Sequence, residues 1–368
     1  MKKKAVCSKV TAILLAAGMT MGMTACQGNS SDSTEEQRRS AESIKEDNQA
    51  ENSASAKEED PQTENTKKTE YPLTITTYGK DGKEYSTTYE KAPEKVLAVY
   101  QGCIETMLEL GLEDHLAATA GLDNEVPEAQ KSAFSKVKYL DEFTPSKETV
   151  TMLEPDMIFS WSSLFGAKTL GDAQEWIDKG TNVYISSNTA VAEKSLENEY
   201  TDILNMGKIF DVQDKAEGIV NEMKDTIATV KEETKGETEK PSVLVLESGK
   251  DGFTNYGQDS LAGDMVTQLG GTLANPDGSS LGKEDVITAN PDVIFVVYMP
   301  YSGDDPETVK QEKLNVLLED ETYASLDAVK NQRVVPIMLS EMYASATRTQ
   351  DGIETIAKGL YPDLKLGE

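Results

Sequence analysis

The chain has 368 residues, a net charge of −29 at pH 7, a single histidine and three cysteines. Binding to nucleic-acid phosphates requires clustered Lys and Arg, so a chain this acidic is not expected to have a nucleic-acid partner. The length is enough for one large or two medium domains.

The first 25 residues are typical of an export signal. Three lysines at positions 2–4 precede an apolar run over residues 10–23, which is shorter than the ~20 residues of a spanning helix. Met23-Thr24-Ala25-Cys26 then resembles the bacterial lipobox, with methionine in place of the commoner leucine. This resemblance implies cleavage before Cys26 and a lipid on its thiol. We therefore expect an extracytoplasmic protein anchored to the membrane; the alternative is an ordinary signal followed by a chance cysteine.

Residues 26–70 are polar and charged, with almost no large apolar side chain. Such a segment buries too little surface to offset its ordering entropy, so it is predicted to be a disordered tether. A contact with the cell wall is the alternative to a plain spacer. Cys7 is removed with the signal and Cys26 carries the lipid, so Cys103 has no partner. The fold must therefore be stable without an internal disulfide.

From Tyr71 onward the pattern is that of a folded α/β protein. Two strands rich in Thr and Tyr are predicted at residues 73–78 and 85–89, around a turn at 80–82. Short apolar strands then alternate with helices. A helix is predicted over residues 213–233, because apolar side chains recur there at helical spacing and Gly236 follows. Further strands are predicted at 96–100, 117–120, 157–161 and 183–186 before this helix, and at 243–247, 293–298 and 334–338 after it.

A repeated motif indicates two similar lobes. Lys147-Glu148-Thr149-Val150 precedes Pro155-Asp156, and Lys283-Glu284-Asp285-Val286 precedes Pro291-Asp292 at the same offset. Each copy is typical of a short helix with an acidic first turn, ended by proline and followed by a buried strand. The expected domains are a signal peptide at 1–25, the lipidated tether at 26–70, an N-terminal lobe at 71–210, an interlobe helix at 211–236 and a C-terminal lobe at 237–368.

The order and spacing of these motifs resemble the substrate-binding proteins of ATP-driven importers for iron–siderophore, haem and cobalamin complexes. The resemblance extends from about Pro93 to the end of the chain. The segments that carry it are residues 92–96 and 105–112, Leu153-Glu154-Pro155-Asp156, residues 289–295 and residues 328–334. It implies an α/β fold of two Rossmann-like lobes joined by a single long rigid helix, with the ligand cleft between the lobes.

The resemblance also implies partners: a dimeric ABC permease and its ATPase. In this family a surface glutamate on each lobe engages permease arginines, and the repeat places that pair at Glu148 and Glu284. The alternative is that both glutamates only stabilise helix termini, by ~0.3–1 kcal/mol each. We expect a monomer that captures its ligand, closes modestly and delivers it, because a long helix between the lobes limits hinge movement.

In such a fold the ligand contacts loops at the carboxyl ends of the strands. Aromatic side chains there offer broad contact to a large ligand, although each of them could instead cap the core. The predicted ligand-binding residues are Tyr100, Gln101, Trp161, Ser162, Tyr256, Tyr298, Tyr301, Tyr343 and Arg348.

The number of charged side chains limits which class of ligand the protein is expected to bind. Beyond the tether the arginines are Arg333 and Arg348, whereas a triply anionic catecholate usually calls for several converging cations, which lysines could supply. A neutral or weakly charged ferric hydroxamate, or a corrinoid, suits the sequence better. His115 lies in a polar turn and is expected to be exposed, which disfavours a role as an axial haem ligand. The binding proteins of zinc and manganese importers hold the metal with clusters of histidines and carboxylates, which a single histidine cannot form.

We therefore expect no intrinsic cofactor and no metal ligands from the protein. The expected cargo is a ferric siderophore, with cobalamin or haem as alternatives. An enzyme is the rival class, but the sequence contains no glycine-rich phosphate loop and no Cys-x-x-Cys pair. A hydrolase that uses a carboxylate pair, or a sensor on the same fold, is the remaining alternative.

Overall fold

The computed structural model describes residues 67–366, with the side chain of Asp81 excepted. The expected signal peptide, the lipidation site at Cys26 and most of the expected tether lie outside the described residues. In the described part, every helix is too short or too polar to cross a bilayer.

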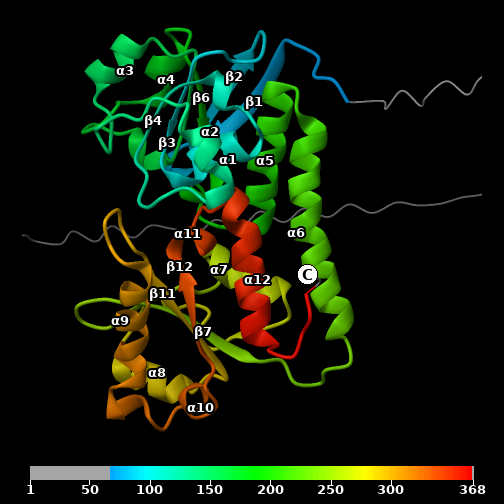
Figure 1. The fold of residues 1–368 in the computed structure, drawn as a ribbon, viewed down its shortest axis with the longest axis vertical. Helices are drawn as coiled ribbons and strands as arrows, with labels where there is room; N and C mark the ends of the chain where they lie inside the picture. Colours follow the sequence, from blue (N-terminus) through cyan, green and yellow to red (C-terminus); the bar gives the residue numbers. More distant parts are fainter. Residues whose placement is uncertain (1–66, 367–368) are drawn as a thin grey trace, which may run out of the picture. The chain divides into compact units, whose positions relative to one another are not determined.

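The first lobe is built on a four-stranded parallel sheet in the order β4-β3-β5-β6 (Figure 1). Helices lie on both sides of this sheet, which explains why its strands form nearly continuous apolar runs in the sequence. Its strands are β3 (Val96–Val99), β4 (Leu116–Ala120), β5 (Met157–Ser160) and β6 (Asn182–Ile185). Its helices are α1 (Gln101–Glu109), α2 (Lys131–Phe134), α3 (Lys147–Leu153), α4 (Ala173–Ile177) and α5 (Leu196–Phe210).

A β-hairpin covers the β6 edge of this sheet. Strands β1 (Leu73–Tyr78) and β2 (Glu84–Tyr89) pair antiparallel. The Thr77 hydroxyl donates to the Ile185 carbonyl at 2.8 Å and accepts from the Ile185 N–H at 2.9 Å. The Thr87 hydroxyl donates to the Val183 carbonyl at 3.3 Å. Threonine side chains of the hairpin therefore satisfy backbone groups that an open edge strand would leave unpaired.

The second lobe contains a six-stranded sheet. Strands β7, β11 and β12 are parallel with β11 in the middle, while β8 and β10 extend the sheet as antiparallel strands and β9 pairs with β7. The strands are β7 (Ser242–Ser248), β8 (Phe253–Asn255), β9 (Thr272–Leu273), β10 (Ser280–Leu281), β11 (Val293–Tyr298) and β12 (Val334–Met338). The helices are α7 (Leu261–Gln268), α8 (Lys283–Ala289), α9 (Pro306–Leu318), α10 (Asp327–Lys330), α11 (Leu339–Met342) and α12 (Thr349–Leu360).

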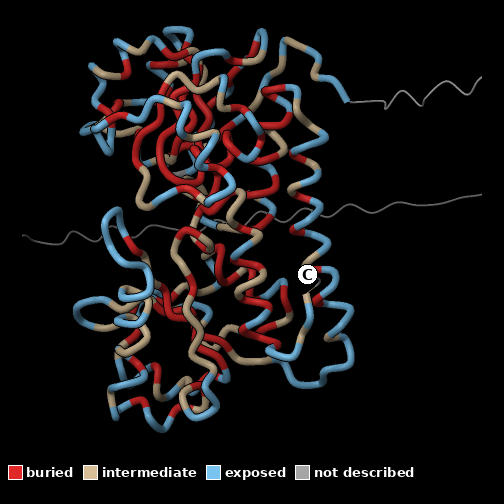
Figure 2. The backbone as a smooth tube through the Cα atoms, in the orientation of Figure 1, coloured by how far each residue is buried: buried red, intermediate tan, exposed pale blue. Residues whose placement is uncertain are grey.

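Helix α6 (Gln213–Glu233) leads from the first lobe to the second (Figure 1). All described strands of the first sheet precede it in the chain, and all described strands of the second sheet follow it. Its apolar face is buried against α5 and α12, and its other face is exposed along its length (Figure 2). The observed bounds are those predicted from the spacing of the apolar residues.

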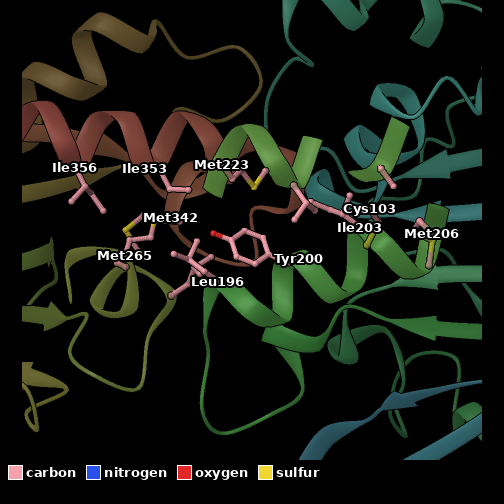
Figure 3. Close-up of a cluster of buried hydrophobic side chains, with 14 of the residues drawn as sticks. Cys103, Leu196, Tyr200, Ile203, Met206, Met223, Met265, Met342, Ile353 and Ile356 are labelled. Atoms are coloured by element: carbon pink, nitrogen blue, oxygen red, sulfur yellow. The ribbon is translucent and has the colours of Figure 1, made fainter. Parts of the chain in front are cut away.

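One hydrophobic core extends through both lobes. It joins Ile203 of α5 and Met223 of α6 to Met265 of α7 and Ile353 of α12. Figure 3 shows these residues beside Met342 at the end of α11. Separating the lobes would expose this apolar surface to water, which costs about 25 cal/mol of free energy per Å² of apolar area.

The predicted fold class is confirmed, and each predicted strand is present with small differences at its ends. The strands predicted to end at Tyr100 and Trp161 end one residue earlier, at Val99 and Ser160. The reason is that Tyr100 and Trp161 each begin a helical turn. Two aromatic residues are thereby placed where the chain leaves the sheet.

The repeated motif forms equivalent structures in the two lobes. Its helices are α3 and α8, and each is followed by Pro-Asp and a central strand. The Asp156 carboxylate accepts from the Lys95 N–H at 2.9 Å, and the Asp292 carboxylate accepts from the Ser242 N–H at 2.7 Å. Each aspartate thus fixes the start of the neighbouring strand, β3 or β7, which explains why both copies carry it.

Candidate ligand-binding site

A cleft of about 220 Å³ lies between the two lobes. It lies at the carboxyl ends of β3, β5, β11 and β12, where the loops of both lobes face each other. In the first sheet, β3 is flanked by β4 on one side and by β5 on the other, so the connections after β3 and β4 run in opposite directions. Open α/β sheets bind ligands at the carboxyl end of the strands at such a switch point. The lining residues are Gln101, Gly102, Asp123, Trp161, Met299, Tyr301, Leu339, Ser340, Tyr343, Ala344 and Ser345.

Three aromatic rings form a row across the cleft. The Tyr100 and Trp161 ring centroids are 5.1 Å apart, and those of Trp161 and Tyr343 are 5.9 Å apart. Tyr343 comes from the second lobe, so the row joins the lobes. Within residues 67–366, the buried Trp161 Nε1 and Ser345 hydroxyl have no hydrogen-bond partner. Such groups are rare in folded proteins, and both belong to residues that line the cleft.

The backbone around the cleft has an unusual geometry. Tyr100, Ala344 and Ala346 have φ angles of 75°, 46° and 50°, a region that L-residues seldom adopt. A Cβ atom added to Gly102 would lie 2.7 Å from the Ala344 carbonyl oxygen. The second-lobe segment 344–346 therefore lies against the start of α1, and only glycine permits this approach. Backbone strain of this kind is concentrated at functional sites.

Arg348 forms an ion pair between the two lobes. Its Nε and Nη2 donate to the two Glu105 carboxylate oxygens at 2.7 and 2.6 Å. The Glu105 side chain is 0% exposed and that of Arg348 is 10% exposed. Burial raises the pKa of Glu105, while the guanidinium acts in the opposite direction. Arg348 also donates to the Ser340 hydroxyl at 3.1 Å. Its charge is therefore neutralised beside the cleft.

Gln101 shapes the wall of the cleft. Its Oε1 accepts from the backbone N–H groups of Asp123 and Asn124 at 3.0 and 3.3 Å, and its Nε2 donates to Glu105. These bonds hold the loop after β4 against the start of α1. Burial raises the pKa of Asp123, whose carboxyl group lines the cleft.

The structure brings some of the predicted ligand-binding residues together. Gln101, Trp161, Tyr301 and Tyr343 line the cleft, and the Tyr100 ring packs against that of Trp161.

The other predicted residues have partners or neighbours of their own. The Ser162 hydroxyl donates to the Thr189 carbonyl, and the Tyr256 hydroxyl donates to Glu247 at 2.7 Å. Burial and then Glu247 raise the pKa of Tyr256. Tyr298 is half-buried near Glu341 and Glu307, and burial together with these charges raises its pKa.

Some lining residues were not predicted from the sequence: Gly102, Asp123, Leu339, Ala344 and Ser345. Asp123 follows the strand predicted at 117–120 after Gly121, which has a φ of 80°. A glycine directly after a predicted strand marks a turn, so the loop after this strand could have been included. Leu339 and Ser345 carry no such signal, because helix α11 was not predicted.

His115 lies away from the cleft. It is half-buried, its Nδ1 is 2.6 Å from the Pro93 carbonyl oxygen, and its ring packs against Phe210. The expectation that His115 is exposed is therefore wrong, while its place outside the cleft lining argues against an axial haem ligand. Among the described residues, no group of three His, Cys, Asp or Glu side chains could hold a metal ion.

A comparison with known sequences identifies the family. The family described as "Periplasmic binding protein" matches residues 96–338. This range contains the sheets of both lobes, and the N-terminal hairpin lies before it. The chain belongs to the periplasmic binding protein family. This membership confirms the resemblance found in the sequence motifs.

Individual relatives agree with this assignment. The Petrobactin-binding protein YclQ of Bacillus subtilis is 26% identical over 268 residues, which are 70% of this chain and 79% of the relative. The ABC transporter substrate-binding lipoprotein YvrC of the same species is 23% identical, over 80% of this chain and 87% of the relative. The crystal structure of a periplasmic binding protein from Veillonella parvula has a TM-score of 0.73 and 30% identity, and covers 80% of this chain and 93% of that structure.

The family assigns a general role. The protein is an extracytoplasmic binding protein of an ABC transporter, with a small-molecule ligand and with a permease and an ATPase as partners. The cleft between the lobes, at the carboxyl ends of the strands, is the candidate position for that ligand.

Proposed function

We propose that this protein captures a siderophore-type metal chelate and delivers it, chemically unchanged, to its ABC permease. The observation that carries the proposal is the aromatic row of Tyr100, Trp161 and Tyr343 across the interlobe cleft, next to the unpaired Trp161 Nε1. Flat rings and a few polar donors suit a large organic ligand. The family resemblance and a relative named for binding petrobactin support a ligand of this class.

The charges of the cleft favour a neutral or weakly charged chelate, such as a ferric hydroxamate. The lining residues include Asp123 but no lysine or arginine, and the nearby Arg348 is neutralised by Glu105. A triply anionic catecholate complex would find no free cation in this lining. A corrinoid is the second candidate, because it is large and carries little charge. Haem is less suitable because His115 lies outside the lining.

Tryptophan fluorescence tests this proposal directly, since the chain has two tryptophans. Trp161 lines the cleft, while Trp176 is buried in the first lobe with its Nε1 donating to the Leu170 carbonyl at 3.0 Å. A neutral ferric trihydroxamate should quench the fluorescence of Trp176→Phe but not that of Trp161→Phe. Mass spectrometry should recover the chelate intact. Quenching that depends on Trp176, or a chemically altered chelate, would contradict the proposal.

We also propose the membrane anchor and the domain limits. A lipid on Cys26 would hold the protein near its permease, and the relative named as a substrate-binding lipoprotein supports this. The proposed limits are a signal peptide at 1–25, a tether at 26–70, lobes at 71–210 and 237–368, and an interlobe helix at 211–236, in a protein that acts as a monomer. Cys26→Ser should release the protein from cells and weaken uptake, while ligand affinity stays unchanged.

Glu148 and Glu284 are the proposed contacts with the permease. Both are exposed in the first turns of α3 and α8, and in the described part of the chain neither side chain forms a hydrogen bond or ion pair. The lysine before each one has another partner: Lys147 pairs with Glu175 at 2.7 Å and Lys283 pairs with Asp320 at 2.6 Å. Both glutamates are therefore available to arginines of a partner. Their equivalent positions suit a permease dimer with two similar pockets.

A further inference from the structure

The interlobe cleft is small for the ligand proposed above. Its volume is about 220 Å³, whereas pockets that enclose a drug-sized ligand measure roughly 300–1,000 Å³. A chelate that carries an arm beyond its metal-binding core needs more room than this. Either the lobes separate, which their shared hydrophobic core opposes, or part of the ligand occupies a second hollow next to the cleft.

A second hollow of about 460 Å³ lies beside the cleft. Its most prominent side chains are aromatic: Tyr139 is 41% exposed, and its ring centroid is 6.0 Å from that of Phe134. The Tyr139 hydroxyl accepts from the Leu122 N–H at 3.1 Å, which fixes the ring in place. Exposed apolar surface of this kind commonly marks a binding site. The hollow is lined by Leu122, Asn124, Glu125, Val126, Lys131, Phe134, Tyr139 and Ser302.

The cleft and the hollow share a wall. Asp123 lines the cleft, and the next residue, Asn124, lines the hollow. On the second-lobe side, Tyr301 lines the cleft and Ser302 lines the hollow. The loop 299–304 therefore divides one space from the other.

This division depends on few contacts. The Ser302 N–H donates to the Asp123 carbonyl at 2.9 Å, and the Asn124 Nδ2 lies 3.6 Å from the Met299 sulfur. Tyr301 is 58% exposed, and the turn is held within itself by the Asp304 carboxylate, which accepts from the Tyr301 N–H. One backbone hydrogen bond is a weak barrier, so the loop can lift without unfolding.

The hollow carries no uncompensated positive charge. Its one basic side chain, Lys131, pairs with Glu125 at 2.9 Å and with Glu128 at 3.0 Å. Between these charges at the rim, the wall is formed by Leu122, Val126 and the two rings. The chemistry of this wall suits an uncharged aryl or alkyl group, because burial of apolar area would be the main gain.

We propose that this hollow is a second subsite, continuous with the cleft, that binds an uncharged aryl or alkyl arm of the chelate while the metal-binding core occupies the cleft. The arm enters when the loop 299–304 lifts from Asp123. This inference rests on the proposed function, and it adds Phe134 and Tyr139 to the residues that determine specificity.

Two ferric trihydroxamates with the same core test the subsite, one carrying a terminal aryl arm and the other a terminal methyl group. The wild-type protein should bind the aryl form more tightly. Phe134→Ala should weaken binding of the aryl form by roughly tenfold and leave the methyl form unchanged. Met152→Ala is the control, because Met152 is a 78% exposed apolar residue on α3 of the same lobe and lines neither the cleft nor the hollow.

A second measurement does not depend on the stability of the variant. An aryl azide on the arm should, after irradiation, label peptides of the wild-type protein from residues 122–139 or the peptide that contains Ser302. Labelling elsewhere, or an equal loss of both chelates in Phe134→Ala, would overturn the subsite and leave the proposed function intact. If the wild-type protein bound neither chelate, the proposed function and the subsite would both be overturned.

Discussion

Arg348 of the second lobe and Glu105 of the first form a buried, bidentate ion pair, with N–O distances of 2.6 and 2.7 Å. Two parallel hydrogen bonds between a guanidinium and a carboxylate give strong geometric selectivity. The pair lies beside the cleft and fixes the position of helix α1 relative to the segment after β12. Sequence reasoning gave Arg348 a role in ligand binding, whereas the geometry favours an interlobe contact.

Removing one partner of this pair should be costly. Arg348→Ala leaves the Glu105 carboxylate buried without its cation, so the free energy of unfolding should fall by about 3–5 kcal/mol in urea denaturation. The double variant Glu105→Met/Arg348→Met should lose much less. Lys147→Ala is the control, because its pair with Glu175 is exposed and screened by water, so its loss should change stability little. A similar small loss in Arg348→Ala would contradict the prediction.

Glu199 should make stability depend on pH. It is buried on α5, where the oxygens of its carboxyl group accept from Asn188 and from the Ala346 N–H of the second lobe. Burial and then the charge of Asp202 raise the pKa of Glu199 from 4.5 to about 8. Between these values the folded protein keeps a proton that the unfolded chain has lost, so the free energy of unfolding falls as pH rises from about 4.5 to 8.

Urea denaturation at several pH values measures this slope. Glu199→Gln cannot titrate, so its stability should fall less steeply between pH 5 and 8, by up to about 1.4 kcal/mol per pH unit. The comparison concerns the slope, and it holds whatever the absolute stability of the variant. Glu148→Gln, at an exposed position, should keep the wild-type slope. Equal slopes in Glu199→Gln and the wild-type protein would show that another group is responsible.

The sequence predicts the fold better than the site, for physical reasons. Strands buried on both faces must be apolar along their whole length, so they leave continuous apolar runs, and helix α6 must bury one face, so it leaves apolar residues at helical spacing. The site instead depends on long-range contacts. The pairing of Glu105 with Arg348, across 243 positions, follows from how the lobes pack and leaves no local pattern. Tyr100 and Trp161 were found because they are the last residues of predicted strands, whereas Asp123 lies further into its loop.

Gly102 should be intolerant of a side chain. A Cβ atom there would lie 2.7 Å from the Ala344 carbonyl oxygen, and a backbone atom cannot move aside easily. Gly102→Ala should therefore lower the free energy of unfolding by roughly 1–3 kcal/mol. Gly218→Ala on α6 is the matched control, because no atom lies within 4 Å of its added Cβ, and it should stabilise the protein by about 0.4–1 kcal/mol. Thermal or urea unfolding of both variants checks the difference, and a stable Gly102→Ala protein would contradict it.

Charge reversal tests the proposed docking residues. The double variant Glu148→Arg/Glu284→Arg should repel permease arginines, so it should fail to stimulate the ATPase of the reconstituted transporter. Its ligand affinity should equal that of the wild-type protein, because α3 and α8 contribute no residue to the cleft lining. The double variant Glu222→Arg/Asp225→Arg, on the exposed face of α6, makes the same change in net charge and is the control. If ligand affinity were lost in the double variant, the two residues would instead belong to the cleft or the fold.

Ligand binding should produce little movement between the lobes. The core that joins Ile203 and Met223 to Met265 and Ile353 would be exposed by a wide opening, and the pair of Arg348 with Glu105 would be broken. The radius of gyration from X-ray scattering should therefore be the same with and without a ferric chelate. Hydrogen exchange should change at the Ser302 amide, whose bond to Asp123 separates the cleft from the neighbouring hollow, and should stay constant along α6. A large change in the radius of gyration would show that the shared core does not restrain the lobes.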